Sequence, residues 1–150
     1  MSNATLEKFG DPDTRLCDYR YWRLLLRSAQ PTLGSLILGA KAEALAFSEL
    51  DPEAYAELAQ ATRDIERVLG EFVSYQRINY LMLMMVDPHV HFHVIPRYEG
   101  TREFEGVIFP DKGWPRPPDF GSAITLEEPH KQRLVETLRG YFAKPGVAAA

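Results

Sequence analysis

Three histidines occupy alternate positions in one short stretch, and this alternation constrains the fold more than any other feature of the sequence. His89, His91 and His93 are separated by single apolar residues, and an apolar pair follows them. Successive side chains of a β-strand point to opposite faces, so the three imidazoles would share one face. Residues 90–95 are therefore predicted to form a strand whose apolar side chains enter a core while its histidines line the opposite surface.

The rest of the chain predicts further strands and two main helices. Asp51 and Pro52 suit the first turn of a long amphipathic helix that continues to about Tyr75. A second helix is expected from about residue 125 or 128, after a proline-rich loop at 110–120. Aromatic and aliphatic stretches predict strands at residues 19–28, 35–38, 77–86 and 103–109.

This order of elements predicts one α+β domain that spans residues 1–150, with an antiparallel sheet covered by helices. We expect the core to occupy about residues 19–109. Residues 110–150 would form a C-terminal loop, a helix and a small-residue tail after Pro145.

Composition limits the classes of partner. The chain has 17 basic and 21 acidic residues, a formal net charge of -4, and therefore no basic excess for binding extended nucleic acid. It has no apolar run of about 20 residues and no secretory signal at its start, so no membrane association is expected. A lone cysteine, Cys17, excludes an internal disulfide. These features predict a cytoplasmic protein.

Three uses of the histidine stretch compete. A solvated strand face would more usually carry Thr, Lys, Glu or Ser than three histidines. A metal-dependent His-x-His enzyme would use His91 and His93, with Glu99 as a possible third ligand. The ends of the stretch, His89 and His93, start about 13 Å apart and converge poorly on one ion. Nucleophilic chemistry remains, because a neutral imidazole can attack phosphorus and form a labile P–N bond.

The stretch from His89 to Ile95 reads His-Val-His-Phe-His-Val-Ile, and it resembles the His-φ-His-φ-His-φ-φ signature of the histidine triad family, where φ is apolar. Pro96-Arg97-Tyr98, the run from Leu33 to Leu38 and Asn79-Tyr80 are also similar to family members. The resemblance implies a five-stranded antiparallel sheet with two main helices, and a homodimer that shares one continuous sheet.

The resemblance also implies hydrolysis or transfer at the α-phosphate of a nucleotide or dinucleotide, without a metal or an organic cofactor. His91 would carry the nucleotidyl group covalently. His89 and His93 would position the phosphate, assist the leaving group and orient the nucleophile, with the division between them open. A dinucleoside polyphosphate hydrolase and a nucleoside phosphoramidase are both compatible with this pattern.

Candidate substrate-binding positions follow from the same comparison. Arg27 stands where many members carry an acidic residue, Ser35 where they often carry His, and Met85 where they often carry Asn or Gln. Arg97 is a further candidate, for binding phosphate. Trp114 is another, for contacting a base or a partner subunit. The substitutions at Arg27 and Met85 leave a second function open, namely a nucleotide-binding or interaction module with weak catalysis.

Overall fold

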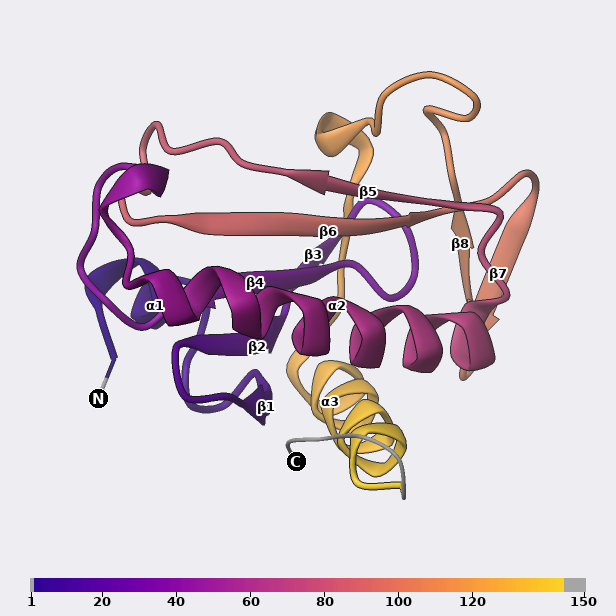
Figure 1. The fold of residues 1–150 in the computed structure, drawn as a ribbon. Helices are drawn as coiled ribbons and strands as arrows, with labels where there is room; N and C mark the ends of the chain where they lie inside the picture. Colours follow the sequence, from indigo (N-terminus) through magenta and orange to yellow (C-terminus); the bar gives the residue numbers. More distant parts are fainter. Residues whose placement is uncertain (1, 145–150) are drawn as a thin grey trace.

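The histidine stretch lies in a five-stranded antiparallel sheet, one strand in from its edge (Figure 1). The computed structural model describes residues 2–144. Across the sheet, the strands follow the order β1 (Arg15–Asp18), β2 (Trp22–Leu26), β4 (Leu36–Ala40), β6 (His91–Arg97) and β5 (Arg77–Leu81). The expected antiparallel α+β architecture is confirmed.

The strand register assigns a different role to each face of the sheet. Leu36 pairs with Val94, and these side chains belong to the main core. Ile37 pairs with His93, and Gly39 pairs with His91, so these residues share the opposite face. We call that side, with its imidazoles, the histidine face.

The main core is closed by α2 (Pro52–Val73), which runs across the front of the sheet in Figure 1. Asp51 caps this helix by accepting a hydrogen bond from the Glu53 amide, as its sequence predicts. The helix ends at Val73, two residues earlier than expected, and its C-cap residue Ser74 has a left-handed φ of 48°. On its apolar side, Ile65 and Leu69 are fully buried.

Two predicted strands are shorter or more divided than expected. The strand expected at 19–28 is confined to β2 (residues 22–26), because residues 19–21 form the turn after Asp18 from which β2 pairs back onto β1. The strand expected at 77–86 ends at Leu81, and the chain then leaves the sheet. Met85 and Val86 are consequently 82% and 84% exposed. Apolar composition alone did not indicate where pairing stops.

The stretch expected as one strand at 103–109 is a hairpin. It consists of β7 (Thr101–Phe104) and β8 (Val107–Pro110), joined through Glu105 and Gly106. Both turn residues have positive φ, 48° and 86°, as the favoured two-residue hairpin turns require.

The remaining elements frame the sheet. α3 (Glu128–Phe142) packs against β1 and α2 and buries Leu134 and Leu138. A two-stranded ladder joins β3 (Ala29–Gln30) to β9 (Ile124–Thr125). The short elements are α1 (Ala4–Lys8), η1 (Phe47–Glu49) and η2 (Phe120–Ser122). Within residues 2–144, no helix is both long and apolar enough to cross a membrane. The tail expected after Pro145 lies outside the described residues.

Candidate active site

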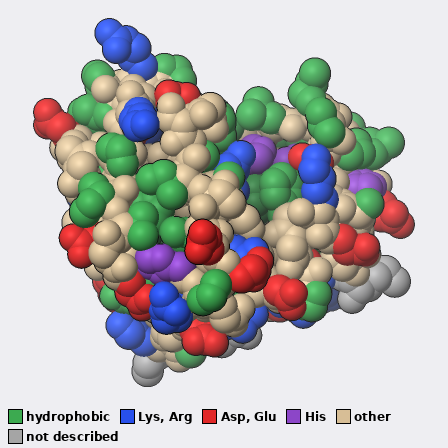
Figure 2. Space-filling view, turned by 180° about the vertical axis from the view of Figure 1, so that it is seen from behind, with side chains coloured by type: hydrophobic (Ala, Val, Ile, Leu, Met, Phe, Trp, Pro, Cys, Tyr) green, Lys and Arg blue, Asp and Glu red, His purple; other side chains and the backbone are tan. Residues whose placement is uncertain are grey.

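The triad is less regular and less exposed than the alternation predicts. β6 begins at His91, so His89 precedes the strand instead of lying on it. His91 is 0% exposed and His93 is 8% exposed, although an open, solvent-facing surface was expected. Figure 2 views the molecule from the side opposite α2, where histidine and basic side chains gather around a hollow.

The N-terminal segment covers this face. Leu6 of α1 is buried in a small second core with Leu25 and Ile37. Phe9 extends the cover, with its ring centroid 5.6 Å from that of His91 and 5.9 Å from that of His93. The core was expected to begin at about residue 19, so the element that buries the triad was missed.

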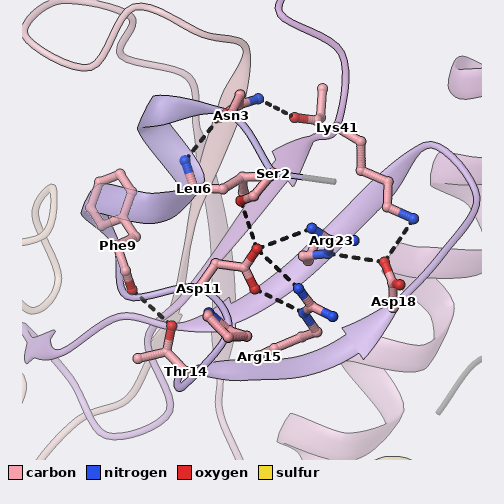
Figure 3. A network of polar contacts seen from close by, with 12 residues as sticks. Ser2, Asn3, Leu6, Phe9, Asp11, Thr14, Arg15, Asp18, Arg23 and Lys41 are labelled. Atoms are coloured by element: carbon pink, nitrogen blue, oxygen red, sulfur yellow. Dashed lines mark hydrogen bonds and ion pairs between the residues drawn. The ribbon is translucent and has the colours of Figure 1, made fainter.

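A network of polar contacts anchors the segment (Figure 3). The buried carboxylate of Asp11 accepts hydrogen bonds from Ser2 Oγ at 2.7 Å, Arg15 Nε at 2.8 Å and Arg23 Nη1 at 3.0 Å. Burial by itself would raise the pKa of Asp11, but the hydrogen bonds from Arg15 and Ser2 and the charge of Arg23 outweigh it and lower the pKa. Asn3 caps α1 and also donates to the Ala40 carbonyl, so the cover is held at both ends.

All three imidazoles of the triad have their Nδ1 atom engaged by the protein. Nδ1 of His91 lies 2.7 Å from the carbonyl oxygen of His89. Nδ1 of His89 lies 2.9 Å from the hydroxyl of Thr5. Nδ1 of His93 accepts a hydrogen bond of 3.3 Å from Nε of Arg27. The Nε2 edges of the rings are therefore the edges left for chemistry.

His91 is distinguished by the state of its Nε2 atom. A carbonyl oxygen can only accept, so Nδ1 of His91 carries the proton and Nε2 has a free lone pair. Among the described residues, this Nε2 is the one buried side-chain nitrogen or oxygen without a hydrogen-bond partner. Buried polar atoms are normally satisfied, so an orphaned one calls for an explanation. A nucleophile that awaits an electrophile supplies one.

His93 lies in an environment that opposes protonation. Burial is the largest cause, the charges of His91 and Arg27 act in the same direction, and together they lower the pKa of His93 to about 4. Phe120 closes the other side of the ring, with centroids 5.6 Å apart. The guanidinium of Arg27 stacks 5.1 Å above the same phenylalanine ring.

The other predicted substrate-binding residues are dispersed. Ser35 is buried and donates to the Thr32 carbonyl. Met85 lies in the exposed segment after β5. Among the residues predicted to bind substrate, all within the described part of the chain, only Arg27 hydrogen-bonds a triad imidazole.

Arg97 and Trp114 lie together in a groove that the triad histidines do not line. Both line a groove of about 670 Å³ between β5 and the proline-rich loop. The guanidinium of Arg97 is already engaged, since it binds Asp111 through two nitrogens and also donates to Asn79 and to the Arg116 carbonyl.

Sequence reasoning missed three residues that contact the triad, namely Thr5, Phe9 and Phe120. A weak signal for the first two exists, because Asn3 is a good N-cap and apolar residues follow it at a spacing of three. A metal centre finds no support within residues 2–144, where no group of three or more His, Cys, Asp or Glu side chains is placed to hold an ion.

Comparison with known proteins places the fold. No protein-family model matches the sequence, and no curated protein matches it. Solved structures do. A histidine triad protein from Sinorhizobium meliloti has a TM-score of 0.72 at 23% identity, covering 94% of this chain and 96% of its own. One from Bradyrhizobium japonicum has a TM-score of 0.70 at 20% identity, with the same coverage.

A diadenosine triphosphate hydrolase from Plasmodium falciparum is also similar, with a TM-score of 0.63 at 12% identity, over 88% of this chain and 78% of that one. At these identities the likeness is one of fold. The chain has the α+β fold of histidine triad proteins, a five-stranded antiparallel sheet with two main helices.

Proposed function

We propose that this chain, built on the histidine triad fold, is a nucleotide-phosphate hydrolase or nucleotidyl transferase that acts at an α-phosphate through His91. The observation that carries the proposal is the state of His91. Its Nδ1 proton is held by the His89 carbonyl at 2.7 Å, and its buried Nε2 has no partner. A neutral imidazole fixed in this tautomer presents its lone pair for attack without first losing a proton.

The chemistry then divides into two steps. In the first, Nε2 of His91 attacks the α-phosphorus, a P–N bond forms, and the bond to the leaving group breaks with its electron pair. In the second, water or another acceptor attacks phosphorus, and the P–N electrons return to Nε2. The carbonyl of His89 stabilises the positive charge that the imidazole carries between the steps.

Two substrate classes fit this chemistry, and the fold neighbours favour one of them. Dinucleoside polyphosphates are suggested by the diadenosine triphosphate hydrolase among the structures of similar fold. Nucleoside phosphoramidates remain the other class. Arg27 contacts His93 and would bind a phosphate oxygen, while Arg97 and Trp114 line an outer groove.

The test is turnover of diadenosine tri- and tetraphosphate and of an adenosine phosphoramidate, with and without a chelator. Wild type is compared with His91→Gln, and His130→Gln is the matched control, because His130 lies on α3 and contacts the Phe104 carbonyl. Turnover that resists the chelator, disappears in His91→Gln and persists in the control supports the proposal. Intact-protein mass spectrometry after an alkaline quench should detect the nucleotidyl adduct in wild type and in His130→Gln, but not in His91→Gln.

A second function, a nucleotide-binding module with slow turnover, is favoured by one observation. His91 has no exposed surface, so substrate reaches Nε2 only when the cover over the histidine face shifts. Micromolar binding of a nucleotide with neither turnover nor adduct would support this function over catalysis.

A further inference from the structure

We propose that Arg27 is a positioning residue that holds His93 as a neutral hydrogen-bond donor, so that the leaving-group proton comes from His89. This inference rests on the proposed function and divides the work between the two histidines that flank the nucleophile. It follows from the different partners that their Nδ1 atoms have.

The partner of His93 permits only one neutral tautomer. A guanidinium can donate hydrogen bonds and cannot accept them, so Nδ1 of His93 must be the unprotonated acceptor for Nε of Arg27. The ring proton is then on Nε2, where it can donate to a phosphate oxygen. Adding a second proton would place an N–H directly against the guanidinium.

Arg27 is held in this position independently of His93. Another of its nitrogens donates to the Ala29 carbonyl, and its guanidinium stacks on the Phe120 ring. Within residues 2–144, no carboxylate lies at ion-pair distance from Arg27, so its charge is not neutralised locally. The carboxylate of Asp87 acts on the pKa of His93 in the opposite direction, and its effect is smaller than those of burial, His91 and Arg27.

His89 has a partner that permits both charge states. The hydroxyl of Thr5 can donate a hydrogen bond to an unprotonated Nδ1 or accept one from a protonated Nδ1. The same oxygen also lies 3.3 Å from the His89 amide, which fixes the backbone of the residue. Lys8 of α1 and Asp87, two residues before His89, pair with each other at 2.6 Å.

The proton balance closes with His89 in this role. A protonated His89 gives its Nε2 proton to the leaving atom as the P–O or P–N bond breaks. Its Nδ1 stays protonated and donates a hydrogen bond to the Thr5 hydroxyl. Water then attacks the nucleotidyl-His91, and the proton that the water loses returns to His89. His93 donates one hydrogen bond throughout and exchanges no proton.

The first experiment measures the tautomer directly, by long-range ¹H–¹⁵N NMR of the imidazoles. In wild type we expect His93 to be protonated at Nε2 alone and to titrate near pH 4. Arg27→Met, which removes the donor and keeps the bulk, should raise that midpoint, and Arg27→Lys should preserve much of the lowering. A wild-type His93 that carries its proton on Nδ1, or that titrates near 6.5, would overturn the inference.

The second experiment varies the leaving group. His89→Gln and His93→Gln are compared on an adenosine phosphoramidate, whose amine must be protonated to depart, and on the p-nitrophenyl ester of AMP, whose phenolate departs without a proton. His89→Gln should lose about 10²–10⁴-fold on the first substrate and far less on the second. His93→Gln retains an amide donor, so its loss should be the same on both.

The outcomes separate this inference from the function on which it rests. Wild type with neither turnover nor adduct refutes the proposed function, and the NMR titration still decides whether Arg27 fixes His93. Turnover that depends on His91, but with the leaving-group effect at His93 instead of His89, refutes the inference alone.

Discussion

The contact between α1 and the histidine face can be tested by adding a methyl group on one side of it and shortening a side chain on the other. Gly39 faces Leu6, and a Cβ added at Gly39 would lie 2.5 Å from Leu6 Cδ2. Leu6 is 1% exposed and confined between Leu25 and Ile37, so its methyl group has little room to move. Gly39→Ala should therefore displace α1, unless Leu6 is shortened in the same protein.

The expected magnitudes follow from packing. Gly39→Ala overpacks the contact and should cost about 1–2 kcal/mol of unfolding free energy, since the clash is with the end of a side chain. Leu6→Ala should cost about 2–4 kcal/mol through lost burial and a cavity. In the double variant the new methyl group occupies part of that cavity. The double variant should thus be more stable than the sum of the single changes predicts, by about 1–2 kcal/mol.

Urea unfolding of the four proteins, followed by circular dichroism, measures this coupling. Two additive single changes would refute the docking of Leu6 onto Gly39, and with it the burial of the triad by α1. Gly140→Ala on α3 is the control, because nothing lies within 4 Å of a Cβ added there.

Three further outcomes are expected. Because the pKa of His93 is lowered to about 4, wild type should lose stability as the pH falls from 6.5 to 4, by at most about 3 kcal/mol from this residue. Urea unfolding across that range should show a smaller loss in His93→Gln. Asp11→Asn leaves the buried Arg23 without one of its carboxylates and should cost about 3 kcal/mol in the same assay, whereas the exposed Asp13→Asn should not. Met85→Asn should change the unfolding free energy by less than about 0.5 kcal/mol, because the side chain is 82% exposed; a larger change in thermal denaturation would mean that the segment packs elsewhere.

The elements with strong local signals were predictable. α2 begins where Asp51 and Pro52 place it, because a cap and a first-turn proline act within one turn of helix. The strand that carries His91 and His93 follows from period-two alternation, which tertiary packing did not override. It starts at His91, one residue after the predicted start, and His89 lies before it in contact with Thr5.

The errors arise where pairing partners decide the outcome. Residues after Leu81 are as apolar as those before it, yet only the earlier ones pair with β6. Burial of the histidine face could not be read from its own residues either, because the cover comes from Leu6 and Phe9, far away in the sequence. A local pattern shows which side chains share a face and says nothing of what packs on it.

The same distinction explains which part of the site the motif encodes. The proton on Nδ1 of His91 is fixed by the carbonyl of a residue two positions away, so the motif by itself specifies the tautomer of the proposed nucleophile. His89 and His93 depend on Thr5 and Arg27, which are 84 and 66 positions away in sequence. Those distant positions can change without altering the motif. The roles of the flanking histidines can therefore differ between proteins that share both the fold and the three histidines, and a role assigned to either one must be argued from its Nδ1 partner.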